Sequence, residues 1–162
     1  KLVPALALLL AVAPALAKDD HGVFGVWAAF RDPQVPRCYA IAAAERGSAE
    51  GASAFPAYAT VGTWPRRGVR GQVHFRLSRE LHDNPRLTLA IGGERFALTG
   101  GGVDAWAADR TMDAGIVAAM RSAARMTLSA TDRAGRRFTE RFGLEGVATA
   151  MDAATVGCAR IR

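Results

Sequence analysis

Residues 64–80 read Trp64-Pro-Arg-Arg-Gly-Val-Arg-Gly-Gln-Val-His-Phe-Arg-Leu-Ser-Arg-Glu80. This stretch holds five arginines and one glutamate, and it also has the clearest strand pattern of the chain. From position 72 onward apolar and polar side chains alternate, with Val73, Phe75 and Leu77 on one side. Such a two-residue period is typical of a strand with one face in a core and the other in water. The stretch therefore predicts both a wall of the core and a positively charged outer surface.

The rest of the chain reads as further short strands separated by turns. The predicted strands cover residues 23–30, 38–43, 56–63, 72–78, 86–91, 94–98, 126–130 and 138–142. Gly92-Gly93 predicts a tight hairpin, because paired glycines accept the positive φ angles of primed turns. The glycine-rich residues 99–102 are expected to form a flexible loop, and no phosphate-binding motif follows them.

Two helices are expected late in the chain. The first covers residues 112–124, with Asp109 or Thr111 as its N-terminal cap. The second starts at Gly146 and buries one stripe of side chains at helical spacing. That stripe consists of Val147, Met151, Ala154 and Cys158.

These elements together predict the fold class. Eight strands in hairpins, with one helix after the sixth strand and one at the C-terminus, indicate a mainly β fold, an antiparallel β-sandwich of the immunoglobulin-like kind. Residues 18–162 are long enough for a single domain with its own core. The lack of alternating strands and helices disfavours a nucleotide-binding parallel sheet.

The first 17 residues have the pattern of a secretory signal peptide. A basic start and an apolar run lead to Ala15-Leu16-Ala17, so we expect cleavage after Ala17. The alternative, a membrane anchor, is disfavoured because the run is shorter than about 20 residues and contains Pro4 and Pro14. The expected location is the periplasm, with association to the envelope left open and no transmembrane segment in the mature chain.

The chain contains two cysteines, Cys38 and Cys158. An even count in an oxidising compartment predicts a structural disulfide, whereas the alternative is two buried free thiols. The bridge would join the second predicted strand to the buried stripe of the last helix and hold the C-terminus on the sheet.

No catalytic, metal-binding or cofactor-binding set is predicted. His82 and Asp83 are adjacent in a turn, so their side chains point apart, and no serine lies in a nucleophile elbow. His21 follows two aspartates, but it does not sit at the third position that an N-terminal copper or nickel site needs. Trp64 and Trp106 could line a sugar-binding groove, although packing in the core or at its rim is the commoner role of tryptophan.

The candidate binding residues belong to the basic stretch. They are Arg66, Arg67, Arg70, His74 and Arg76. Arginine side chains suit phosphate and carboxylate, so these residues could contact an anionic envelope component or an acidic partner. The net charge of +6 permits such attraction, and nucleic acid is not expected as a partner of an exported chain. The alternative is an ordinary solvated face in which Glu80 or Glu94 pairs across strands.

Several short motifs resemble those of a known family. They are Gly25-Val26-Trp27, Cys38, Asp104-Ala105-Trp106, Ala118-Ala119-Met120-Arg121, and Leu144-Glu145-Gly146 before a helix with Cys158. The arrangement resembles the invasion-associated locus B family of exported alphaproteobacterial proteins, and more closely its divergent relatives. Members usually open with Gly-Asp-Trp, where this chain has Val26. The resemblance implies a β-sandwich of the periplasm or envelope with no known catalytic residues.

These observations lead to one functional hypothesis and two alternatives. We expect a non-enzymatic envelope protein that acts as a binding or interaction module through a basic surface. The first alternative is a periplasmic hydrolase of unrecognised type, and the second is a purely structural or stress-related envelope component. The ligand, the partner and the oligomeric state stay open.

Overall fold

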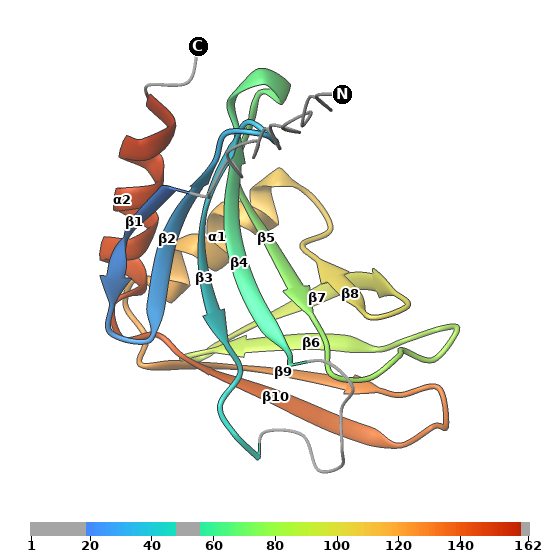
Figure 1. Cartoon of the computed structure of the whole chain (residues 1–162). Coiled ribbons are helices and arrows are strands. Elements are labelled where there is room, and N and C mark those ends of the chain that lie inside the picture. Colours follow the sequence, from blue (N-terminus) through green and yellow to red (C-terminus); the bar gives the residue numbers. More distant parts are fainter. Residues whose placement is uncertain (1–18, 48–55, 160–162) are drawn as a thin grey trace, which may run out of the picture.

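The computed structural model describes residues 19–47 and 56–159, in which ten antiparallel strands form one sheet (Figure 1). The strands are β1 (Asp19–Phe24), β2 (Trp27–Asp32), β3 (Arg37–Ala43), β4 (Tyr58–Trp64), β5 (Val69–Arg76), β6 (Leu87–Ile91), β7 (Glu94–Gly101), β8 (Asp104–Trp106), β9 (Arg125–Thr131) and β10 (Arg137–Gly143). Their order in the sheet is β1-β2-β3-β4-β5-β8-β7-β6-β9-β10. The predicted mainly β, antiparallel fold is confirmed. The predicted signal peptide at residues 1–17 lies outside the described residues.

Strand β7 carries the sheet from one layer of the sandwich to the other. Residues 94–98 pair with β6, whereas residues 99–101 pair with β8. At Gly100 an added Cβ would lie 2.6 Å from the carbonyl oxygen of Asp104 and 2.7 Å from Cδ1 of Leu87, so the crossing requires glycine. Figure 1 shows the result, with β2–β5 running steeply and β6, β9 and β10 running across them. The two layers are therefore crossed halves of one bent sheet.

The sequence analysis missed two strands, both next to glycines. The predicted strand 23–30 is a hairpin of β1 and β2, because Gly25 adopts a φ of +57° and reverses the chain. The predicted loop 99–102 is instead the end of β7 and the turn into β8. Apolar residues continue through the first turn, so hydrophobic periodicity alone could not reveal it.

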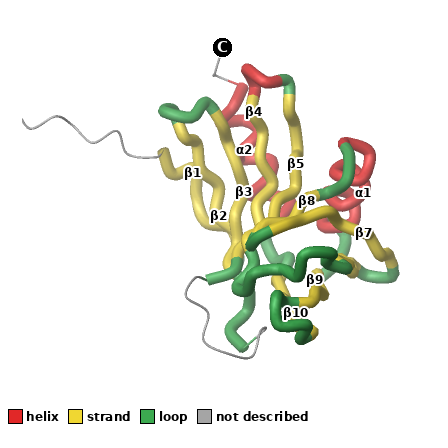
Figure 2. Tube along the Cα trace, turned by 90° about the vertical axis from the view of Figure 1, so that its right-hand side faces the viewer, coloured by secondary structure: helices red, strands yellow, loops and turns green. Residues whose placement is uncertain are grey.

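Two helices pack against the sheet. Helix α1 (Arg110–Met120) follows β8 and contacts β5, whereas α2 (Val147–Ala159) lies along β1, β2 and β3 (Figure 2). Asp109 caps α1, since its carboxylate accepts a hydrogen bond of 2.8 Å from the backbone N–H of Met112. The helix ends four residues before the predicted position 124, because residues 121–124 turn the chain into β9.

The core lies between the two layers and the helices. The predicted inward residues Val73, Phe75 and Leu77 are all buried, and they join one cluster with Trp27 and Phe142. The indole N–H of Trp27 is satisfied, because it donates to a backbone carbonyl of β10 at 2.9 Å. The basic stretch therefore forms a wall of the core, as predicted.

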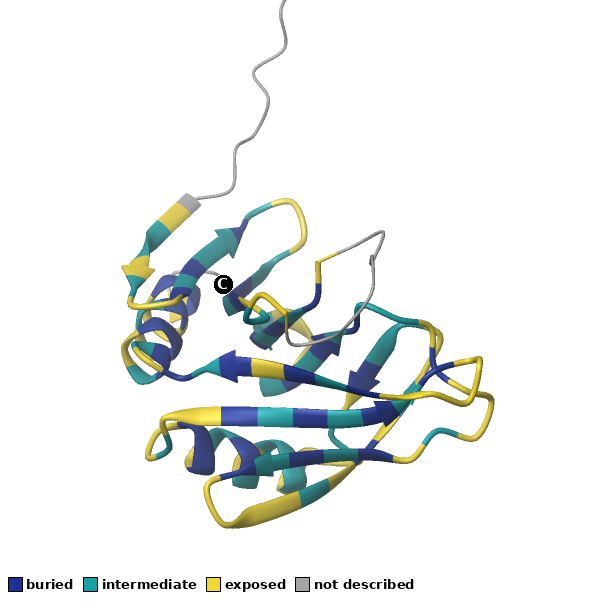
Figure 3. Ribbon diagram, turned by 90° about the horizontal axis from the view of Figure 1, so that it is seen from below, coloured by how far each residue is buried: buried dark blue, intermediate teal, exposed yellow. Residues whose placement is uncertain are grey.

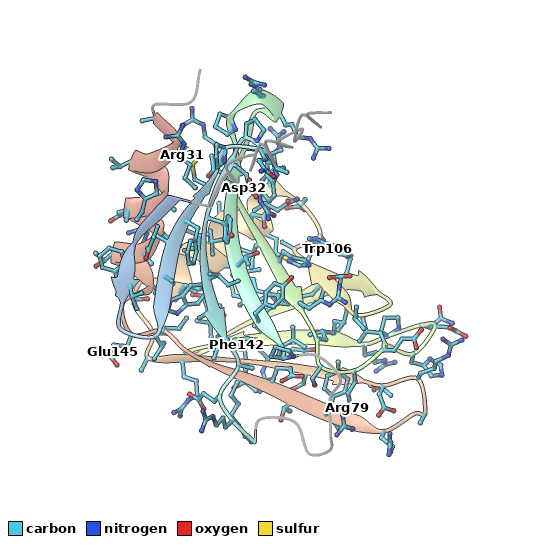
Figure 4. The ribbon with its side chains drawn as sticks, viewed as in Figure 1. Arg31, Asp32, Arg79, Trp106, Phe142 and Glu145 are labelled. Carbon is cyan, nitrogen blue, oxygen red and sulfur yellow. A yellow bond between two sulfur atoms is a disulfide. The ribbon has the colours of Figure 1, made fainter. Side chains whose placement is uncertain are left out.

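Helix α2 is fixed to the sheet near both of its ends. At its C-terminal end Cys38 and Cys158 form the predicted disulfide, with Cα atoms 5.6 Å apart. At its N-terminal end the backbone N–H of Val26, in the β1–β2 turn, donates to the carbonyl of Glu145 at 3.2 Å (Figure 4). A Cβ on Gly146 would overlap the carbonyl oxygen of Phe24. The β1–β2 turn can therefore pack this closely on the start of α2 only because residue 146 is glycine.

Asp132 closes the β9–β10 hairpin and is only 5% exposed. One carboxylate oxygen accepts hydrogen bonds from the backbone N–H groups of Ala134 and Arg136, and the other lies 3.2 Å from the guanidinium groups of Arg79 and Arg136. The backbone N–H of Arg136 contributes most to lowering the pKa of Asp132. Burial opposes this effect, whereas side-chain hydrogen bonds from Arg79 and Arg136 and the charge of Arg136 add to it.

This lowered pKa gives Asp132→Asn a pH-dependent effect on stability. The stability that the carboxylate contributes is fully present above the ordinary aspartate pKa of about 4 and is lost as pH falls through the lower pKa of the folded state. We expect the variant to be less stable than the parent at neutral pH and the difference to shrink in acid. Urea denaturation of both proteins at neutral and acidic pH measures this. A difference that is constant with pH would contradict it.

Candidate functional site

The outer face of β3, β4, β5 and β8 carries a groove of about 430 Å³. Its residues alternate with the buried inward ones along each strand, so they point away from the core. We call this hollow the aromatic groove. It is lined by Arg37, Tyr39, Ile41, Tyr58, Thr60, Trp64, Gln72, His74 and Trp106.

The strand register brings the rings of the groove together. Thr60 on β4 pairs with His74 on β5, which in turn pairs with Trp106 on β8. The ring of His74 lies 5.3 Å from the ring of Trp106 and 6.1 Å from that of Tyr58, measured between centroids. Trp106 stays 37% exposed at the edge of this row (Figure 4). Residues from three strands thus present one aromatic surface.

Gly62 forms the base of the groove at the end away from Trp106. Gly62 pairs with Tyr39 on one side and with Gln72 on the other. A Cβ at this position would lie 2.7 Å from the indole ring of Trp64, so the ring lies directly over the bare backbone. Because Gly62 has no side chain, the Trp64 ring can rest against the backbone of β4. Tyr39, which pairs with Gly62, is only 8% exposed.

Polar groups stand at both ends of the aromatic groove. The imidazole Nε2 of His74 lies 2.9 Å from the carboxylate of Asp104, and Arg76 lies 3.6 Å from the other oxygen of that carboxylate. At the opposite end the guanidinium of Arg37 stacks 4.7 Å from the centre of the Tyr39 ring. The groove therefore combines flat apolar surfaces with a few fixed hydrogen-bonding groups, as ligand sites do.

The five predicted binding residues do not form one cluster. Arg66 and Arg67 are exposed on the short 3-10 helix η1 (Pro65–Arg67), and Arg70 is exposed near the start of β5. His74 and Arg76 lie further along β5, and both contact Asp104, whose carboxylate offsets the charge of Arg76. Anion binding by these residues stays a prediction.

The sequence analysis named three residues of the groove, Trp64, His74 and Trp106, and missed its two tyrosines. Both Trp64 and Trp106, proposed for a sugar-binding groove, lie in it. Tyr39 and Tyr58 were not singled out, although they fall on the outward positions of β3 and β4. Counting alternate positions outward from a buried neighbour on each strand would have placed both tyrosines on the outer face.

The other two histidines, His82 and His21, lie outside the aromatic groove and make local contacts. His82 is exposed in a turn, where its Nδ1 accepts a hydrogen bond of 3.3 Å from the backbone N–H of Asn84. The ring of His21 packs against Gly157 of α2, where a Cβ would lie 2.7 Å from it. Over residues 19–47 and 56–159, no group of three or more histidine, cysteine, aspartate or glutamate residues is placed to hold a metal ion. In the same ranges, no helix has the length and apolar character to cross a membrane.

Comparison with known proteins gives a relationship at the level of fold. No protein-family model matches the sequence, and a search of curated proteins found no significant match. Among solved structures, invasion associated protein B from Bartonella henselae matches with a TM-score of 0.59 and 14% identity, covering 89% of this chain and 99% of that chain. This chain shares the fold of invasion associated protein B. The match extends over nearly the whole sandwich, and the resemblance inferred from short motifs is confirmed for the fold alone.

The motifs that resemble the invasion-associated locus B family take part in holding this fold together. Residues 25–27 and 144–146 are far apart in sequence but meet where the β1–β2 turn packs on the start of α2. Residues 104–106 form β8, which links β5 to β7. Residues 25–27, 104–106 and 144–146 therefore each have a structural role in this chain.

Proposed function

We propose that this chain is an exported, non-enzymatic binding protein of the cell envelope and that its ligand binds in the aromatic groove. The observation that carries the proposal is the aromatic row formed by Tyr58, His74 and Trp106 on the outer face of the sheet. Aromatic residues lower the free energy of folding most when they are buried in the core. Rings gathered on an outward face, with hydrogen-bonding groups beside them, are typical of a ligand site.

A sugar ring is the ligand class that best fits this groove. The indole of Trp106 is partly exposed and offers a flat apolar surface to the C–H face of a pyranose. Gln72, His74 and Arg37 supply hydrogen-bonding groups at the groove's margins for the hydroxyl groups of the sugar. A negatively charged substituent on the sugar would be attracted by Arg37, whose guanidinium also lies 3.7 Å from the carboxylate of Asp32.

Two chemical features of the chain support export and envelope association. The Cys38–Cys158 disulfide would persist in an oxidising compartment such as the periplasm. The exposed Arg66, Arg67 and Arg70 offer a basic contact surface for an acidic partner protein of the envelope.

Substitution of Trp106 by alanine tests the proposal. Screening the parent against envelope-type oligosaccharides and titrating the best binder by calorimetry should give a measurable affinity. We expect Trp106→Ala to weaken it about tenfold, because one stacking surface is lost, and Trp106→Phe to retain most of it. Both variants should fold normally, since this side chain is partly exposed.

Two results would contradict this function. The proposal fails if Trp106→Ala binds as tightly as the parent, or if the parent binds no oligosaccharide. Cleavage of the sugar, lost in His74→Gln, would instead favour the hydrolase alternative, in which Asp104 orients His74 as a general base.

A further inference from the structure

The outer face of the second layer carries rows of hydroxyl groups. Thr88 on β6 pairs with Ser129 on β9, which pairs with Thr139 on β10. Thr127 and Thr131 lie two positions on either side of Ser129 and therefore share its face. Figure 3 views this layer from below and shows buried residues alternating with less buried ones along its strands.

Four exposed arginines surround these hydroxyl groups. Arg137 pairs across the sheet with Thr131, and Arg141 pairs with Thr127. Arg95 on β7 pairs with Ala90, which itself pairs with Thr127. Arg86 and Arg137 line a shallow hollow of about 310 Å³ with Thr88, Ser129 and Thr131. We call the surface bounded by Arg86, Arg95, Arg137 and Arg141 the four-arginine face.

The charge of this face is not compensated within the described residues. None of its four arginines forms an ion pair with a carboxylate of residues 19–47 or 56–159. The nearby carboxylates are engaged by other arginines, since Glu45 pairs with Arg125 at 3.0 Å and Asp132 pairs with Arg79 and Arg136. Four positive charges therefore project from one sheet face without a neutralising partner in this part of the chain.

The spacing of the four-arginine face suits a planar array of anions. Arg137 and Arg141 are four residues apart on one strand, which separates them by about 13 Å, and β6 lies about 10 Å from β10 across β9. The threonine, serine and alanine side chains between the four arginines are short. The long arginine side chains therefore extend beyond them into solvent. Arginine forks and hydroxyl groups are both donors to phosphate oxygens. The face also lacks large apolar side chains that would insert into a bilayer.

We propose that the four-arginine face docks the protein on a membrane surface rich in anionic phospholipids, with head-group phosphates bound between the arginines and the hydroxyl groups. This contact is separate from the aromatic groove, because the groove lies on the outer face of β3, β4, β5 and β8. Docking through the second layer leaves the groove open to a ligand. The protein thus binds lipid head groups through one layer and its ligand through the other.

Vesicle binding tests this surface directly. The parent is expected to float with phosphatidylcholine vesicles that contain phosphatidylglycerol, to stay behind with pure phosphatidylcholine, and to be released by high salt. The variant Arg137→Ser with Arg141→Ser should bind the anionic vesicles roughly 30-fold more weakly, because each basic residue near an anionic surface contributes about a fivefold factor. The matched control, Arg66→Ser with Arg67→Ser, removes the same charge from η1 and should bind nearly as the parent does.

Three outcomes would overturn the proposal. Equal losses in the two variants would mean that net charge alone drives binding, and unchanged binding in the β10 variant would exclude the face. Binding to soluble polyphosphate without binding to vesicles would assign the face to a soluble polyanion instead. If circular dichroism shows that the β10 variant is unfolded, the pair Arg86→Ser with Arg95→Ser takes its place, with the same expected loss.

Discussion

Replacing Cys38 and Cys158 together by alanine is expected to lower the free energy of unfolding by about 4 kcal/mol. The disulfide joins residues separated by 120 positions, so its loss restores much conformational freedom to the unfolded chain. The bridge also fixes the last turns of α2, where the other buried residues, Ala154 and Gly157, are small. Urea denaturation of the parent and of the double variant, fitted by linear extrapolation, measures the difference.

Reduction provides an independent control for the disulfide. The parent treated with dithiothreitol should unfold at nearly the same urea concentration as the double variant, because both lack the same cross-link. A change below about 1 kcal/mol in both proteins would show that the bridge contributes little to stability. Destabilisation of the variant without any effect of reduction would instead assign the loss to packing at Cys38 and Cys158.

Gly146→Ala is expected to destabilise the fold by about 3–4 kcal/mol. Gly146 has a φ of +81°, a conformation that costs an alanine about 1–2 kcal/mol. The added methyl group would also overlap the carbonyl oxygen of Phe24, so the β1–β2 turn and the start of α2 must move apart. That movement would lengthen the hydrogen bond from Val26 to Glu145. Thermal and urea denaturation both report this loss.

Gly135→Ala is the matched control for this substitution. Gly135 has a φ of +78°, but apart from its two neighbours in the chain no residue has an atom within 4 Å of the position that its Cβ would occupy. It should therefore show only the backbone cost of about 1–2 kcal/mol. Equal effects of the two substitutions would mean that the contact with Phe24 adds nothing to the cost at Gly146.

Most of the strands could be predicted because they alternate cleanly. Val73, Phe75 and Leu77 are buried as expected, and the stripe ending at Cys158 places the disulfide correctly. These features depend on local periodicity and on an even number of cysteines, both of which can be read from a sequence.

The bend of the sheet and the groove could not be predicted in the same way. Gly25 and Gly100 are needed because their backbones closely approach the carbonyl oxygens of Glu145 and Asp104. The pattern of apolar and polar residues gives no sign of either contact. The aromatic groove depends on cross-strand register, which decides that His74 faces Trp106. Register is set by the whole sheet. The pattern of a single strand therefore indicates which side of the sheet a residue faces, but it does not indicate which residue lies next to it on the adjacent strand.

Because β7 belongs to both layers, it couples their unfolding. Neither half of the sheet has a complete set of hydrogen bonds without β7, so losing the pairing of residues 94–98 also loosens the strand that holds β8. Amide hydrogens on both sides of Gly100 should therefore exchange with solvent through the same global opening rather than through separate local ones. The sandwich has two layers but is expected to unfold as one cooperative unit.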